Sequence, residues 1–350
     1  MRSAAPVLMV VGDAELAGNA DRVAAAAGTR LIRDPAPVRK SWVAASAVLL
    51  DEDSARRCAG KMPRRDGVIL LVSAAASTSA WSAAVAVGAQ HVYCLPADEA
   101  EFIGTLADAA ERGAASVRPG RVIAVVPGKG GGGASILAAA LAQCAGHALL
   151  IDLDPYAAGV DLLLGLESEP GLRWPDLSSR GGRLTWAAVR EALPRRDGLA
   201  VLSGTRAYHE IDPALVASVA EAGRRGGATV VCDLPRQFGS PAACAIELAD
   251  LVVVVTCCDV RAIAAAAAVA GVARTMSRNV GLAVRGPSPG GLSAKEAVEA
   301  VGAPLLAAYR PDPLLPRRLE RGGLHVHRRS ALAAASHRVL AAAGAAERTG

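Results

Sequence analysis

Residues 1–115 alternate short apolar runs with alanine-rich stretches. The apolar runs occupy residues 6–11, 29–32, 47–50, 67–72 and 91–95, and helix-forming stretches lie between them, for example 15–27, 79–88 and 99–111. Short apolar runs that alternate with helices are typical of parallel strands covered on both faces. The pattern predicts an α/β domain with five parallel strands.

The same alternation restarts at residue 121. Residues 113–120, Gly-Ala-Ala-Ser-Val-Arg-Pro-Gly, interrupt it and are typical of a linker. Further apolar runs follow at 121–126, 148–152, 229–233, 250–255 and 280–284. A chain of 350 residues is also too long for one ordinary core. We expect two doubly wound parallel-sheet domains, residues 1–115 and 121–350, joined by a linker at 116–120.

A glycine-rich loop lies between the first strand and the first helix of the second domain. Its sequence, residues 128–135, is Gly-Lys-Gly-Gly-Gly-Gly-Ala-Ser. Backbone N–H groups of such a loop point at phosphate oxygens, and the following helix adds partial positive charge. A flexible connection is the alternative, but the flanking strand and helix favour a phosphate site for ATP or ADP. The candidate binding residues are Gly128, Lys129, Gly130, Gly131, Gly132, Gly133, Ala134, Ser135 and Ile136, with Ser135 also a candidate Mg²⁺ ligand.

The loop departs from the common phosphate-loop pattern at one position. Ala134 stands where the usual lysine belongs, while Lys129 directly follows the first glycine. This placement resembles the deviant loop K-G-G-x-G-K-[ST] of the MinD/ParA family. The resemblance implies that Lys129 reaches the partner's phosphates across a nucleotide-sandwich homodimer. Loss of one preorganised charge commonly costs about 3 kcal/mol at a reacting centre, so we expect weak or moderate binding and slow or absent hydrolysis.

Acidic residues follow two later strands in the order that this family uses. The sequence reads Asp152-Leu-Asp154-Pro after the second strand, and residues 229–233 end in Asp233. The resemblance, which covers residues 121–345, implies that Asp152 lies near the metal and that Asp154, the candidate catalytic residue, orients water. It also implies that Asp233 holds the hydration shell of Mg²⁺. For each aspartate alone, a cap at a strand end is the alternative. Arg285-Gly286-Pro287 replaces the Asn-Arg pair that relatives place near adenine.

The first domain resembles a response-regulator receiver, but its working positions are degenerate. Asp13, Asp51, Ser73 and Leu95 occupy the places of the acidic pair, the phospho-acceptor, the hydroxyl and the lysine. Because leucine replaces that lysine, we expect a pseudo-receiver kept for protein contacts. A response regulator phosphorylated on Asp51 is the alternative.

Charge and composition limit the classes of partner. Eight arginines and three acidic residues lie from Arg310 onward, and this segment carries the whole formal charge of +5. Such an end suits a solvated helical face or DNA, so a DNA-binding ATPase is the alternative function. Residues 330–348 are rich in alanine and contain few bulky apolar residues, so we expect weak or indirect membrane association. Without a signal sequence, a membrane span or paired cysteine spacing, the chain is expected to be cytosolic.

The combination of domains resembles the CpaE/TadZ group, and within it the actinobacterial CpaE-like septum site-determining proteins. The more specific marker is Gly171-Leu-Arg-Trp-Pro-Asp176, which generic phosphate-loop chemistry does not require. The resemblance implies a spatial regulator that positions septum or Tad/Flp pilus-secretion machinery. Its expected partners are a second copy of the chain and proteins of the division or secretion apparatus, at the septum or the cell pole.

Overall fold

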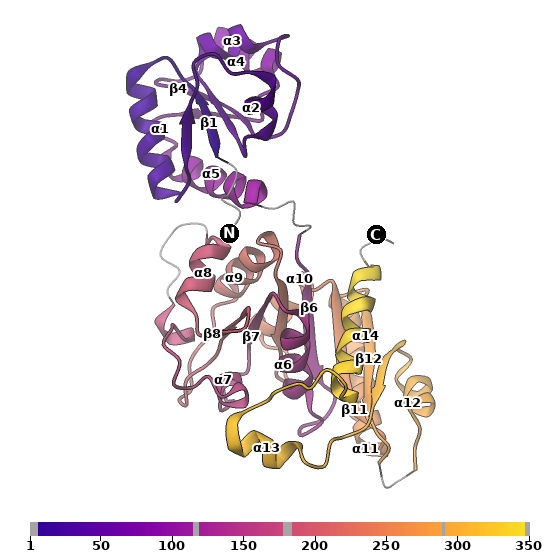
Figure 1. Cartoon of the computed structure of the whole chain (residues 1–350). Coiled ribbons are helices and arrows are strands. Elements are labelled where there is room, and N and C mark those ends of the chain that lie inside the picture. The colour runs from indigo at the N-terminus through magenta and orange to yellow at the C-terminus, as the bar shows by residue number, and fades with distance from the viewer. Residues whose placement is uncertain (1–5, 115–118, 178–183, 289–290, 347–350) are drawn as a thin grey trace. The chain divides into compact units, whose positions relative to one another are not determined.

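The chain forms two compact units in a computed structural model, with the main division between residues 118 and 119. The structure describes residues 6–114, 119–177, 184–288 and 291–346 (Figure 1). Most of the expected linker, residues 116–118, lies outside the described residues.

The first unit is a parallel five-stranded sheet in the order β2-β1-β3-β4-β5. Its strands are β1 Val7–Val10, β2 Leu31–Arg33, β3 Val48–Leu50, β4 Val68–Val72 and β5 His91–Cys94. Its helices are α1 Ala14–Ala26, α2 Arg39–Ala44, α3 Glu52–Cys58, α4 Thr78–Val87 and α5 Glu99–Ala114. Side chains of α1 and α5 form the core on one face, and those of α2, α3 and α4 form the core on the other. The prediction of a five-stranded doubly wound domain is confirmed, although α2 and α3 were not anticipated.

The second unit contains an eight-stranded sheet in the order β13-β12-β11-β6-β10-β7-β9-β8. All paired strands are parallel except β8, which runs antiparallel to β9. The strands are β6 Val122–Pro127, β7 Ala148–Asp152, β8 Arg195–Arg196, β9 Leu199–Leu202, β10 Thr229–Asp233, β11 Leu251–Cys257, β12 Val280–Arg285 and β13 Leu305–Tyr309. This sheet confirms the second predicted parallel-sheet domain.

The helices of the second unit connect the strands and cover the sheet (Figure 1). They are α6 Ala134–Ala145, α7 Val160–Leu164, the 3-10 helix Trp174–Asp176, α8 Trp186–Ala192, α9 Pro213–Arg225, α10 Ser240–Leu248, α11 Val260–Met276, α12 Ala294–Val301, α13 Leu315–Gly322 and α14 Ala331–Ala346. Strand β6 lies centrally, and the chain crosses from β10 on one side of it to β11 on the other. Ligands of open α/β sheets bind at the carboxyl ends of strands beside such a switch point.

Helix α14 packs beside α6 and against β13. Its apolar side is buried, since Ala333, Ala335, Val339 and Ala343 are almost fully inaccessible. This side is therefore used within the domain core. Among the described residues, no helix is both long enough and apolar enough to span a membrane.

Candidate nucleotide-binding site

The glycine loop joins β6 to α6, as the sequence predicts. Gly133 is the N-cap of α6 with φ +93°, a left-handed conformation that favours glycine. Gly128 is required for a different reason: a Cβ there would lie 2.7 Å from Cβ of Ala266 in α11. The loop is thus held by close packing at its start and by a glycine conformation at its end.

The last two residues of the loop, Ala134 and Ser135, differ in what they present to a ligand. Ala134 is buried and carries no charge, whereas the side chain of Ser135 is exposed at the first turn of α6. Ile136 is half-buried and lines a cavity beside the loop. The helix N-terminus therefore offers N–H groups and one hydroxyl, without the lysine that usually neutralises phosphate charge.

Asp152 and Asp233 are direct neighbours across β7 and β10. Burial, reinforced by the charge of Asp152, raises the pKa of Asp233 to about 8, and a hydrogen bond with Ser135 opposes this shift. Burial also raises the pKa of Asp152 to about 6, while backbone N–H groups of Asp154 and Val160 lower it. The two buried carboxyls lie close enough to disfavour each other's charge.

The position of Asp233 fits a magnesium site. Its Oδ1 is buried and has no hydrogen-bond partner among the described residues, and the side chain of Ser135 is close enough to lower the pKa of this carboxyl. A buried carboxylate oxygen and a hydroxyl are suitable for Mg²⁺ and the water that it carries. Ser135 and Asp233 would hold the ion, which would neutralise phosphate charge when bound. Asp154 is also near, since its charge contributes to raising the pKa of Asp233.

Asp161 follows β7 in the chain, and its buried carboxylate is the centre of an ionic cluster. Its carboxylate accepts hydrogen bonds from Arg173 Nε at 3.1 Å, Arg206 Nη1 at 3.0 Å and Ser203 Oγ at 3.1 Å. A Cβ at Gly159 would lie 2.5 Å from Asp161 Oδ1, so this position requires glycine. The cluster ties the segment that follows β7 to the segment that follows β9.

Trp174 gives the marker sequence at 171–176 a physical role. Its buried side chain donates a hydrogen bond from Nε1 to the backbone oxygen of Asp152 at 2.6 Å. Its backbone N–H donates to the oxygen of Ser203. Together with Arg173 on Asp161, this contact fixes the loop against the strand end that carries the acidic motif.

Lys129 pairs with an acidic residue of its own chain. Its Nζ lies 3.6 Å from Oδ1 of Asp259, the N-cap residue of α11. A backbone hydrogen bond from Ala262, followed by the charge of Lys129, lowers the pKa of Asp259. The side chain of Lys129 is thus directed from the loop toward the start of α11.

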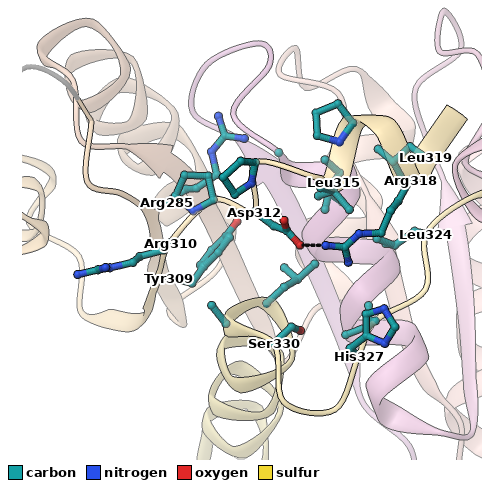
Figure 2. A pocket seen from close by; sticks show the side chains of 18 of the residues that line it. Arg285, Tyr309, Arg310, Asp312, Leu315, Arg318, Leu319, Leu324, His327 and Ser330 are labelled. Atoms are coloured by element: carbon teal, nitrogen blue, oxygen red, sulfur yellow. Dashed lines mark hydrogen bonds and ion pairs between the residues drawn. The ribbon is translucent and has the colours of Figure 1, made fainter.

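A cavity of about 760 Å³ opens beside the glycine loop. Gly133 and Ile136 line its end next to α6, and Arg285 and Tyr309 lie on one side, with residues of α13 on the other (Figure 2). Arg285 Nη2 lies 3.3 Å from the Gly131 backbone oxygen and 3.4 Å from Cys257 Sγ. The position of the cavity relative to the loop suits a nucleoside attached to phosphates on the loop.

The sequence interpretation missed three contributors to this site. Arg285 was read only as a departure from the adenine-binding pattern, and Asp259 and Asp161 received no role in binding. The available signal for Asp259 was its position directly before a helix, whereas the sequence around Arg285 gave no signal. The predicted residues 128–136, Asp152, Asp154 and Asp233 do gather at the same edge of the sheet.

The first unit has a smaller acidic pocket at the candidate phospho-acceptor. Asp51 Oδ1 accepts from Ser54 N at 2.8 Å as the cap of α3, and Oδ2 accepts from the N–H groups of Gly12 and Asp13. Burial opposes ionisation, but these hydrogen bonds outweigh it and lower the pKa of Asp51. Both oxygens of this carboxylate therefore have structural partners.

Solved structures share the fold of the second unit. A ParA family ATPase from Chlorobium tepidum has a TM-score of 0.56 at 18% identity, covering 64% of this chain and 98% of its own. The cell division ATPase MinD of Pyrococcus furiosus has a TM-score of 0.52 at 22% identity, covering 66% and 100%. The septum site-determining protein MinD of Pyrococcus horikoshii, complexed with Mg-ADP, has a TM-score of 0.52 at 21% identity, covering 63% and 93%. The second unit therefore has the MinD/ParA fold.

The class defined by fold and site is a CheY-like domain joined to a domain of MinD/ParA fold. A family model described as Rv3660c-like, CheY-like N-terminal domain matches residues 10–117. The protein described as "Uncharacterized protein Rv3660c" of Mycobacterium tuberculosis is 53% identical over 333 residues, covering 94% of this chain and 95% of that protein. The chain belongs to this Rv3660c family.

Proposed function

We propose that this protein is a nucleotide-biased dimeric scaffold that positions cell-division or Tad/Flp pilus-secretion machinery, in the manner of the CpaE/TadZ group. The observation that supports this most is the combination at the glycine loop. The loop, Ser135 and Asp233 would bind a nucleotide with Mg²⁺, whereas Ala134 supplies no charge for phosphate transfer. Binding that biases assembly then matters more than turnover.

Two neighbours in fold give this proposal its direction. The two Pyrococcus proteins are a cell division ATPase and a septum site-determining protein, the latter in complex with Mg-ADP. In our proposal, the second unit dimerises around nucleotide through Lys129. The CheY-like unit contacts a protein of the division or secretion apparatus and recruits the complex from the cytoplasm to the septum or pole.

Nucleotide binding and oligomeric state test the proposal together. The full chain is titrated with ATP and ADP in the presence of Mg²⁺, and sedimentation velocity is recorded with and without each nucleotide. We expect binding, and a dimer that forms more readily with ATP. A sedimentation coefficient that does not respond to saturating nucleotide would refute the nucleotide bias.

Hydrolysis is tested with Ala134→Lys, which restores the usual loop lysine. We expect slow or undetectable turnover by the native chain and faster turnover by the variant, since one preorganised charge is worth about 10²–10³ in rate. Brisk native turnover that the substitution leaves unchanged would show that Ala134 does not limit catalysis.

DNA binding is the second candidate function, favoured by the exposed arginines 317, 321, 328 and 329 around α13. Contacts to phosphates would make such binding fall steeply with salt. A gel shift at low salt tests this candidate, and the absence of a shifted band would eliminate it.

A further inference from the structure

Arg285 lies across the glycine loop, although it belongs to the far end of β12. Its Nη2 is within hydrogen-bond distance of Gly131 O, and its Nη1 lies 3.4 Å from the place where a Cβ on Gly133 would stand. The guanidinium therefore rests on the last turn of the loop, next to the N-terminus of α6.

The charge of Arg285 is not neutralised by an acidic residue. In the described parts of the chain, no carboxylate lies within ion-pair distance of it, and it donates hydrogen bonds to a carbonyl oxygen and a thiol. A guanidinium has five N–H donors, so donors remain for a ligand. An unneutralised cation beside the N-terminus of α6 and the cavity is suited to bind a phosphate group.

The neighbouring cations are less suited to this role. Lys129 is paired with Asp259, and Arg318 donates to Asp312 at 2.6 Å on the α13 side of the cavity (Figure 2). Arg310 is exposed and makes no hydrogen bond to the glycine loop in the described part of the chain. Of the three arginines that line the cavity, Arg285 alone contacts the loop.

We propose that Arg285 supplies the positive charge that Ala134 removes from the phosphate loop. Its guanidinium binds the phosphates of a nucleotide from the cavity side, while Ser135 and Asp233 hold Mg²⁺ on the other side of the loop. This inference rests on nucleotide binding in the proposed function and identifies the residue on which the affinity depends.

The test measures the affinity of the full chain for a fluorescent ADP analogue in the presence of Mg²⁺. Arg285→Gln keeps a polar side chain with hydrogen-bond donors but removes the positive charge. It should raise the Kd for the ADP analogue about tenfold or more, as expected for a charge-assisted phosphate contact. Arg285→Lys should lose less. Arg310→Ala is the matched control, because it removes an arginine from the same cavity without touching the loop.

A double variant separates loss of charge from loss of fold. Adding Ala134→Lys to Arg285→Gln returns a cation to the site from the loop itself, and it should recover most of the lost affinity. The proposal is overturned if Arg285→Gln binds like the native chain, if Arg310→Ala weakens binding equally, or if the native chain binds no ADP at millimolar concentration.

Sedimentation of the same samples distinguishes this inference from the proposed function. Binding that depends on Arg285 without any change in oligomeric state would support the role of Arg285 and refute the nucleotide-biased dimer. If Arg285→Gln binds nucleotide with native affinity and forms the nucleotide-dependent dimer, the proposed function is supported and the role of Arg285 is refuted.

Discussion

Lys129 Nζ lies 3.6 Å from Asp259 Oδ1 within one chain, and this contact joins the glycine loop to the start of α11. Side-chain exposure is 40% for Lys129 and 36% for Asp259, so the pair is accessible and weak. In the proposed function, this lysine reaches the phosphates bound by the partner. Dimerisation of that type would require Lys129 to leave Asp259, and the intramolecular pair would oppose it slightly.

Asp259→Asn should therefore favour the dimer. Asparagine still caps α11 in place of the carboxylate that accepts from Ala262 N, so the helix is retained while the charge that holds Lys129 is lost. We expect dimerisation with ATP to strengthen by up to about fivefold, the scale of an exposed ion pair. Sedimentation equilibrium measures it. When Lys129→Ala is combined with Asp259→Asn, the gain in dimer stability should disappear. A Lys129→Ala dimer as stable as the native dimer would show that Lys129 does not contact the partner's phosphates.

Trp174 should stabilise the acidic edge of the second unit more by packing than by hydrogen bonding. Trp174→Phe removes the bond to Asp152 O and should cost about 1 kcal/mol in the free energy of unfolding. Trp174→Ala also leaves a cavity and should cost about 3–5 kcal/mol. Urea unfolding followed by far-UV circular dichroism checks both values. Equal losses for the two variants would contradict this division.

Asp51 should behave as a helix cap and not as a phospho-acceptor. Asp51→Ala should destabilise α3 by about 1–2 kcal/mol, whereas Asp51→Asn, which retains an acceptor, should cost less. Because the folded-state pKa is lowered, this contribution is present above the unfolded-state pKa and is lost as pH falls through the folded value. Hydrogen exchange of residues 52–58 measures it. Mass spectrometry after acetyl phosphate treatment should detect no phosphorylation of Asp51.

Much of the fold was predictable because both sheets are built from contiguous apolar runs. The strands β6, β7, β10 and β11 are buried on both faces, and such strands have an unmistakable pattern. Strands β8 and β9 were missed as elements, and β8 consists of two arginines, which carry no apolar pattern. Helix α3 was missed because its N-cap residue, Asp51, was considered only as a candidate phospho-acceptor.

The site was only half predictable, for a reason that lies in sequence distance. Residues within the loop and after each strand follow local motifs, so Ser135 and Asp233 could be predicted as candidate Mg²⁺ ligands from the sequence. Arg285 is 154 residues away from its partner Gly131, and nothing near it in the sequence indicates a phosphate. Such pairs arise from strand order, which the sequence pattern alone does not specify.

Asp233 should make the protein without Mg²⁺ less stable as pH rises. Its folded-state pKa is raised by burial and by Asp152, so between about pH 4 and 8 the folded state binds more protons than the unfolded state. The free energy of unfolding then falls across this range. Mg²⁺ should offset the loss, because a cation stabilises the charged carboxylate.

Asp233→Asn removes the titrating group and should raise Tm at pH 8 more than at pH 5, where the native carboxyl is mostly protonated in the folded state. For a unit of this size, each kcal/mol corresponds to about 2–4 °C. The variant should also lose stabilisation by Mg²⁺ with ADP. Scanning calorimetry at both pH values, with and without Mg-ADP, measures these effects, and Glu247→Gln on α10 serves as a control for removal of one charge. An equal Tm gain at both pH values would show that the buried carboxyl does not titrate in this range.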